Sequence, residues 1–433
     1  MEKLLKLFND VAEYVGFDIQ HFDNTNVTTD EGLSAEMKTF YDKYLIENAK
    51  AVLVHDQFGQ QRDIPKGSGK TVEFRKYAPY PKALIPLTEG VTPSGRKLSV
   101  STITATVNQY GDYTEISDVL ILTAIDNNIL EATKLHAQQA GETLDTVTRE
   151  VLNGGTNVQY ANGQVNARYL LTGGQSQAAD NHYLTVECIR RGVRNLKTNK
   201  AKKINGYYVG IIHPDVAFDL MGDKDWISAS EYAGSEQIFE GEIGKIHGVR
   251  FVETTEAKIF HAEDLVAEGS TNETRALTVA SWTAGTKTVG IDEALSAAEA
   301  TALAGRKVII DGVLYSIKSA TAGTAGSASF VVNETAPAGN APADGDVIYP
   351  GEAGAAGRDV NSTLLLGADA YGVTKVTGGG LQTIVKQLGS AGTADPLNQR
   401  ATVGWKAIKT AVRLVETYML RIETASTFES GAN

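Results

Sequence analysis

The 433-residue sequence predicts an α+β protein, and three features of its patterning support that prediction. Alternating, strand-like runs at residues 71–77 and 98–107 flank a turn-rich segment, which predicts a long β-hairpin. Apolar side chains recur at helical spacing over residues 126–152. Residues 263–357 are rich in Gly, Ala, Thr, Ser and Val and hold short alternating runs between turns, which predicts a small all-β insertion.

Composition limits the class of protein. Charged residues make up 21% and hydrophobic residues 42% of the chain, which is typical of a folded, soluble protein. The single cysteine, Cys188, has no partner for an internal disulfide. The N-terminus lacks the features of a secretory signal and no apolar run is long enough to cross a membrane, so we expect a soluble protein made in the cytoplasm. The length is typical of two or three domains.

Residues 1–57 predict an acidic N-terminal arm that ends in a helix. The arm holds 11 acidic and 5 basic residues, a net charge of −6. From Glu36 to Val54, apolar side chains such as Phe40 and Leu45 recur at helical spacing.

A basic hairpin follows this acidic arm. Residues 58–97 contain eight basic and three acidic side chains, a net charge of +5 within a chain of net charge −12. The strand at 98–107 alone spans roughly 33 Å at about 3.3 Å per residue, so we expect the hairpin to project from the body. Its basic side chains are candidate contact residues: Arg62, Lys66, Lys70, Arg75, Lys76, Lys82, Arg96 and Lys97.

The longest predicted helix covers Asp126 to Leu152. Apolar positions follow spacings of three and four, Asp126 suits the N-cap, and Asn153-Gly154-Gly155 suits the end of the helix. At 1.5 Å per residue this helix is about 40 Å long.

Shorter elements complete the prediction. A second helix is expected at Thr185–Asn199, a buried strand at Tyr207–Ile212 and a short helix at Asp215–Met221, with Asp215 as its cap. The C-terminal stretch Ala401–Phe428 alternates in two runs, which predicts two strands that return to the core.

The most tempting catalytic motif is Gly67-Ser68-Gly69-Lys70-Thr71, which matches the second half of a phosphate-binding P-loop. The full motif needs a glycine where this sequence has Ile64, and it needs a helix after the loop. An alternating, strand-like run follows instead. A nucleotide-hydrolysing enzyme that uses Lys70 and Thr71 is therefore the alternative hypothesis, and a basic loop is the favoured interpretation.

Other chemistry-bearing residues form no recognisable set. The seven histidines are scattered, none at metal-ligand spacing to another, and Cys188 has no cysteine partner. We therefore expect no catalytic residue, no cofactor and no metal site. A β-rich surface-binding module, suggested by residues 263–357, is a further alternative.

Short motifs recur in a definite order over residues 36–262 and 360–428. They are Phe58-Gly59-Gln60, Pro65-Lys66-Gly67, Val72-Glu73-Phe74, Leu87-Thr88-Glu89-Gly90, Gly111-Asp112-Tyr113, Val151-Leu152-Asn153-Gly154, Ile212-His213-Pro214, Gly244 to Phe251, Asp395 to Arg400 and Val403-Gly404-Trp405-Lys406. In this order they resemble the major capsid proteins of tailed phages, in the subgroup typified by the coliphage N-four capsid protein.

The resemblance implies a Hong Kong 97-type phage capsid fold and a structural, non-enzymatic function. Such a subunit self-assembles into hexamers and pentamers that form the icosahedral head shell around packaged double-stranded DNA. The implied partners are further copies of the chain, scaffolding and portal proteins, decoration proteins, and DNA contacted non-specifically on the inner face, with no membrane. The implied location is the virion capsid, assembled in the cytoplasm of the host cell.

The resemblance also implies a domain map. It comprises an N-terminal arm at 1–57, an extended hairpin loop at 58–118, a peripheral domain at 119–196 and 397–433 with a spine helix at about 126–152, an axial domain at 197–262 and 360–396, and an inserted all-β decoration domain at 263–359.

Overall fold

The structure is a computed structural model of a mixed α+β chain, and its described part divides into two compact units. One unit draws on residues 111–140 and 381–406, and the other on residues 51–110, 141–380 and 407–433. The described residues are 53–63, 70–77, 80–87, 89–92, 94–123, 128–161, 165–173, 182–227, 244–266, 276–337, 342–375, 381–390, 395 and 397–428.

The predicted N-terminal arm lies almost entirely outside the described residues. Its expected helix was to end at Val54, but Leu53 and Val54 are described and neither is helical.

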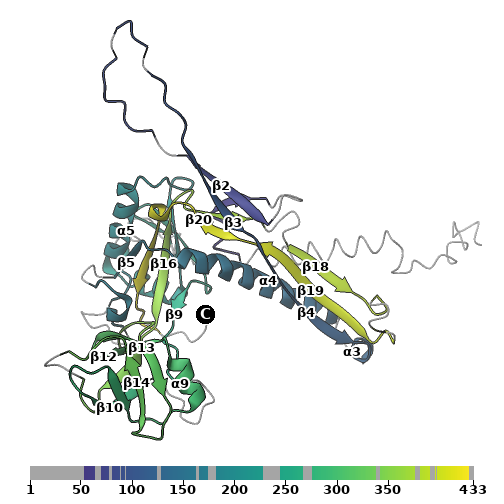
Figure 1. Ribbon diagram of the computed structural model, residues 1–433. Coiled ribbons are helices and arrows are strands. Elements are labelled where there is room, and N and C mark those ends of the chain that lie inside the picture. Colours follow the sequence, from purple (N-terminus) through teal and green to yellow (C-terminus); the bar gives the residue numbers. More distant parts are fainter. Residues whose placement is uncertain are drawn as a thin grey trace, which may run out of the picture. The chain divides into compact units, whose positions relative to one another are not determined.

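A seven-stranded sheet forms the centre of the larger unit (Figure 1). Its middle strands are buried along their whole length because side chains cover both faces, and α5 packs against β21. β21 pairs antiparallel with β16 of this sheet along its whole length. The order is β5 (Val158–Tyr160), β21 (Met419–Thr424), β16 (Val360–Leu366), β6 (Tyr208–Ile212), β8 (Val249–Glu253) and β7 (Lys245–Ile246), with β9 (Ile259–Phe260) also paired to β16.

Helix α5 (Val186–Thr198) confirms the predicted helix at 185–199. The hydroxyl of Thr185 caps it by accepting a hydrogen bond from the Cys188 N–H at 3.4 Å. Its apolar face is buried and includes Ile189, Val193 and Leu196.

Helix α6 (Pro214–Met221) is also where the sequence predicts it, but its cap differs from the prediction. His213 is the N-cap, and its Nδ1 accepts a hydrogen bond from the Asp215 N–H at 3.3 Å. Pro214 occupies the first helical position, where a missing N–H costs nothing, so Asp215 lies inside the helix.

The hairpin consists of β2 (Thr71–Tyr77) and β3 (Val100–Thr106), which pair antiparallel from Thr71 opposite Thr106 to Tyr77 opposite Val100. The hairpin is narrower than the predicted range of 58–118, because the flanking strands find other partners. β1 (Gln60–Arg62) joins β17 (Tyr371–Thr374) and β20 (Ala411–Arg413) in a three-stranded sheet. β4 (Asn108–Ser117) pairs with β19 instead.

The smaller unit contains a three-stranded sheet of β18 (Leu381–Lys386), β19 (Arg400–Lys409) and β4, and the short helix α3 (Asp118–Thr123). The predicted long helix is confirmed as α4 (Asn128–Asn153), whose first half belongs to this unit. The predicted cap Asp126 lies outside the described residues.

Within the smaller unit, Gln139 links the helix to the sheet. Its side-chain amide donates to the Asp112 carboxylate at 2.7 Å and accepts from the Trp405 indole N–H at 3.0 Å. The hydrogen bond from Gln139 lowers the pKa of the Asp112 carboxyl.

The predicted β insertion is a closed six-stranded barrel, so among its described strands no edge is left open. It is not all-β, because helix α9 (Ala297–Leu303) begins at a capping box formed by Ser296 and Glu299. Aliphatic and aromatic side chains fill the interior, among them Val308 and Phe330. The strands run β10 (Leu277–Trp282), β11 (Thr288–Ile291), β14 (Ala328–Val332), β13 (Val313–Thr321), β12 (Lys307–Ile310) and β15 (Val347–Pro350). Outside the barrel, the described residues include the short 3-10 turns η2 (Arg168–Leu170), η3 (Ala355–Gly357) and η5 (Glu416–Tyr418).

Candidate functional site

The base of the β2–β3 hairpin is part of a folded core. Val72 and Phe74 alternate with exposed residues on β2, and both side chains are buried. The Phe74 ring lies against Gly372 of β17, where a Cβ atom would overlap the ring. The alternation therefore fixes which face of the hairpin packs on the body and which faces solvent.

The tip of the hairpin differs from its base. Every described residue between β2 and β3 is exposed, and none belongs to a helix or strand. Large apolar side chains are among them: Leu84 is 80% exposed, Ile85 87% and Leu87 77%. Contiguous exposed apolar side chains of this size are typical of a surface that another molecule covers.

Seven of the eight predicted contact residues are described, and all seven are exposed. None of their side chains forms an ion pair or hydrogen bond with another described residue. The seven residues do not form one cluster but are spread over β1, β2 and the hairpin tip. Arg62 ends β1, Lys70 precedes β2, Arg75 and Lys76 lie on opposite faces of β2, and Lys82, Arg96 and Lys97 lie in the tip, whereas Lys66 lies outside the described residues.

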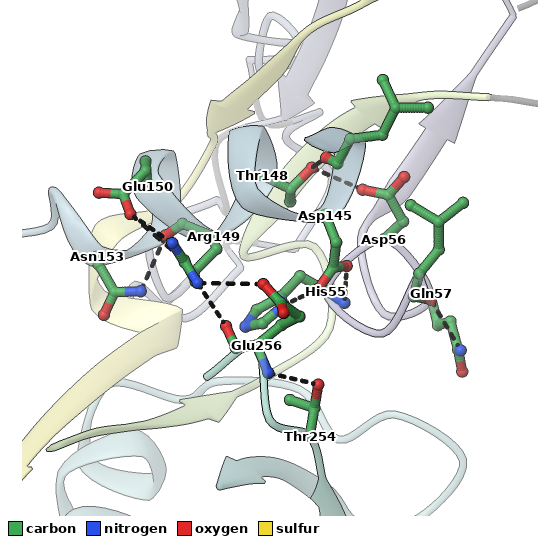
Figure 2. A network of polar contacts seen from close by, with 12 residues as sticks. His55, Asp56, Gln57, Asp145, Thr148, Arg149, Glu150, Asn153, Thr254 and Glu256 are labelled. Carbon is green, nitrogen blue, oxygen red and sulfur yellow. Dashed lines mark hydrogen bonds and ion pairs between the residues drawn. The ribbon is translucent and has the colours of Figure 1, made fainter. Parts of the chain in front are cut away.

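A buried polar network fastens the segment that precedes β1 to helix α4 (Figure 2). The Asp145 carboxylate accepts two hydrogen bonds from His55, one from the backbone N–H at 2.8 Å and one at Nδ1 at 2.6 Å. Both side chains are fully buried. The Tyr371 hydroxyl donates to the His55 carbonyl, and burial raises the pKa of the Tyr371 phenol well above its usual range.

Asp56 extends the network to the C-terminal part of the chain. The Thr148 hydroxyl donates to Asp56 at 2.6 Å, and the fully buried Lys409 ammonium pairs with the other carboxylate oxygen. A buried charge of this kind is tolerated when it is paired and hydrogen-bonded. The network thus connects three chain segments that are far apart in sequence.

Arg149 continues the network from the next position on α4. Its guanidinium donates to the Glu256 carbonyl at 3.1 Å and pairs with the Glu256 carboxylate at 3.4 Å (Figure 2). Burial raises the pKa of the Glu256 carboxyl, and the Arg149 charge partly offsets this effect.

Sequence reasoning missed this network. The buried polar positions Asp145, Thr148 and Arg149 lie at helical spacing on α4, but the prediction for this helix followed its apolar positions. Polar residues inside an otherwise apolar helical stripe were the available signal.

The described residues do not suggest catalysis. The His55 and Asp145 side chains are fully buried, so no substrate reaches them. Lys70 precedes a strand rather than a helix, which removes the geometry that a P-loop requires. In the part of the chain that the structure describes, no group of three His, Cys, Asp or Glu side chains could hold a metal ion, and no helix is long and apolar enough to span a membrane.

Comparison with known proteins links the central part of the chain to phage capsids. Residues 100–258 match the model of a family described as phage capsid protein. This match runs from β3 through α4 and α5 to β8 and covers less than half of the chain. A search of curated proteins finds no match.

Similar solved structures are also phage capsids. The capsid of cyanophage P-SCSP1u is 12% identical with a TM-score of 0.47, and the match covers 85% of this chain and 86% of that chain. The Ralstonia phage GP4 capsid is 12% identical with a TM-score of 0.47, covering 87% and 88%. The cyanophage Pam1 capsid is 13% identical with a TM-score of 0.47, covering 83% and 86%. Because these scores lie below 0.5, we base the functional proposal on the family match and on the protein's own surface.

Proposed function

We propose that this protein is the major capsid subunit of a phage, a structural and non-enzymatic protein that assembles with further copies of itself into the head shell. The family match over residues 100–258 supports this function. The observation that carries it is the hairpin tip, which exposes Leu84, Ile85 and Leu87 beside basic side chains. A solitary soluble protein gains nothing from such a tip, whereas a neighbouring copy can cover it.

In this proposal, the apolar side chains of the tip stabilise the contact between two copies, and the complementary charges determine how the copies are oriented. Burying a large apolar side chain contributes about 1.5–3 kcal/mol, so three of them contribute roughly 5–9 kcal/mol to each contact. The acidic segment 1–57, of net charge −6, complements the basic segment 58–97, of net charge +5. Complementary charges guide orientation more than they add affinity. Contacts between unlike surfaces of identical copies close into rings, which are the hexamers and pentamers of a shell.

The finer assignments follow the Hong Kong 97-type arrangement. In this proposal the β2–β3 hairpin is the extended loop, α4 the spine helix of a peripheral domain, the seven-stranded sheet the main part of an axial domain, and the barrel an inserted decoration domain. The proposed partners are scaffolding, portal and decoration proteins and packaged double-stranded DNA, with assembly in the host cytoplasm. We propose further that this chain belongs to the subgroup of phage capsid proteins typified by the coliphage N-four capsid protein.

In this scheme the buried network has a mechanical function. A projecting arm transmits force to the body that holds it, and the His55–Asp145 and Asp56–Lys409 contacts join the segment before β1 to α4 and β19. Paired, hydrogen-bonded groups in a low-dielectric interior resist separation better than exposed pairs do.

Assembly of the purified full-length protein tests the proposal. We expect capsomers or shells by sedimentation velocity and electron microscopy, with a scaffolding protein added where assembly requires one. The triple variant Leu84→Ser, Ile85→Ser, Leu87→Ser should remain monomeric with an unchanged melting temperature. The matched control Val313→Ser, Val347→Ser alters partly exposed barrel residues and should assemble normally. A wild-type protein that stays monomeric in every condition would contradict the proposal.

A further inference from the structure

A second basic surface lies on helix α5, far in sequence from the hairpin. Residues 186–203 contain seven Lys or Arg and a single acid, Glu187, a net charge of +6. The whole chain carries −12, so the remaining residues together carry −18. A concentration of positive charge in such an acidic protein requires an explanation.

The helix sorts these residues by face. Ile189, Val193 and Leu196 are buried against the sheet, and Gly192 brings the helix so close that a Cβ atom there would lie 2.8 Å from the Leu365 side chain. The opposite face exposes Arg190, Arg194 and Lys197 at spacings of four and three residues, in a row about 10 Å long.

The row continues beyond the end of the helix. Lys200, Lys202 and Lys203 are exposed in the following segment, and Lys203 Nζ lies 5.8 Å from the Tyr208 ring. Lys245 of β7 joins them, with its Nζ 5.0 Å from the Tyr207 ring. We call Arg190, Arg194, Lys197, Lys200, Lys202, Lys203 and Lys245 the α5 basic face.

These charges have no counterpart within the described part of the chain. None of the seven residues of the α5 basic face forms an ion pair with a described residue. Arg191 is different, because it pairs with Glu187 at 2.8 Å, and we leave it out for that reason. Unpaired guanidinium and ammonium groups in a row favour a polyanionic partner.

The surroundings distinguish a nucleic acid from a protein partner. Residues 186–203 expose no large hydrophobic side chain, and the neighbouring Tyr207 is 40% exposed with Lys245 near its ring. Protein interfaces depend on buried apolar and aromatic anchors, whereas contact with a phosphate backbone needs mainly positive charge.

We propose that the α5 basic face binds the phosphate backbone of double-stranded DNA without sequence preference. The inference rests on the proposed function, which places double-stranded DNA beside the shell subunits. All seven residues of the face are Arg or Lys, so we expect binding to come from charge and to weaken steeply with salt.

Fluorescence anisotropy with a labelled 30-base-pair duplex and the full-length protein tests this proposal at several salt concentrations. The variant Arg190→Gln, Arg194→Gln, Lys197→Gln should bind at least tenfold more weakly at low salt, and the slope of log K against log salt should fall by about 3 because three phosphate contacts are lost. The control Lys224→Gln, Lys307→Gln, Lys318→Gln removes the same charge from exposed positions elsewhere and should bind like the wild type.

Three results would overturn the proposal. They are a wild type that does not bind the duplex at low salt, an α5 variant that binds like the control, and tighter binding to poly-glutamate than to DNA, which would indicate an acidic protein partner. The variant Arg190→Lys, Arg194→Lys, Lys197→Arg keeps the charge and should retain binding, which separates charge loss from misfolding. Assembly is measured in parallel, because normal shells without DNA binding reject only this inference, whereas DNA binding without shells rejects only the proposed function.

Discussion

The hairpin tip and the α5 basic face are both basic surfaces on an acidic protein, yet they differ in what accompanies the charge. The tip mixes basic side chains with Leu84, Ile85 and Leu87, all more than three-quarters exposed. Helix α5 has already buried its apolar side chains against its own sheet. Positive charge alone therefore does not identify a partner, whereas the presence or absence of exposed apolar area beside it does.

The two surfaces are also anchored differently. Apolar packing holds α5, with Leu196 fully buried and Gly192 in close contact with the sheet. At the hairpin base the buried Phe74 packs against Gly372, and an ionic network that includes Asp56 and Lys409 holds the segment before β1. Apolar packing tolerates changes in pH and salt, whereas a buried ion pair depends on both partners being present.

The largest expected effect comes from breaking the buried ion pair. Lys409→Met leaves the Asp56 carboxylate buried without its cation, and we expect the free energy of unfolding to fall by about 3–5 kcal/mol. Urea denaturation followed by circular dichroism measures the loss. Lys386→Met at an exposed position is the control. Equal stability of the two variants would mean that the network does not anchor this region.

Glycine substitutions compare the packing at the base of the hairpin with the packing at its tip. Gly372→Ala places a methyl group into the Phe74 ring, and we expect a loss of about 1–3 kcal/mol from overpacking. Gly95→Ala in the tip has open space around it and should leave thermal stability unchanged. Equal melting temperatures of the two variants would contradict a packed core at the base of the hairpin.

Charge reversal on β2 and on α5 tests whether the two basic surfaces bind different partners. Arg75→Glu with Lys76→Glu should raise the protein concentration needed for assembly about three- to tenfold, because exposed pairs contribute about 0–1 kcal/mol each. Monomer stability should not change. The matched reversal Arg190→Glu with Arg194→Glu should leave that concentration unchanged and weaken DNA binding. Light scattering at two salt concentrations measures assembly. Identical effects of the two charge reversals on assembly and on DNA binding would mean that the two surfaces do not bind different partners.

The smallest expected effect concerns pH. Burial lowers the pKa of the His213 imidazole from its usual value of 6.5; the His261 charge adds to this effect, and the Asp215 carboxylate opposes it. The neutral ring is also the form that caps α6. A lowered pKa in the folded state means that stability is complete above pH 6.5 and is lost as pH falls through the lowered value.

Melting temperature measured between pH 7.5 and pH 5 tests this expectation. His213→Asn retains a capping side chain and should reduce the acid-dependent loss. His247→Asn, at an exposed position, should not. An unchanged pH profile in His213→Asn would exclude His213 as the titrating group.

The sequence by itself determined the elements whose cause is local. Alternation over residues 71–77 and helical spacing over 185–199 place β2 and α5 within a residue or two. A period of two or 3.6 residues decides which side chains of one element share a face, so neighbours along the chain are enough to place these elements. The order of short motifs added the relation to phage capsids, which the family match over residues 100–258 supports.

Only the tertiary structure decided which elements meet. Alternation marks a strand but not its partner, so the pairing of β1 with β17, of β4 with β19 and of β16 with β21 was invisible in the sequence. The same holds for the closure of the barrel and for the bonds that His55 makes to Asp145 and Lys409 makes to Asp56, 90 and 353 positions away respectively. Local patterning depends on neighbours along the chain, whereas pairing and buried charge depend on residues that only folding brings together.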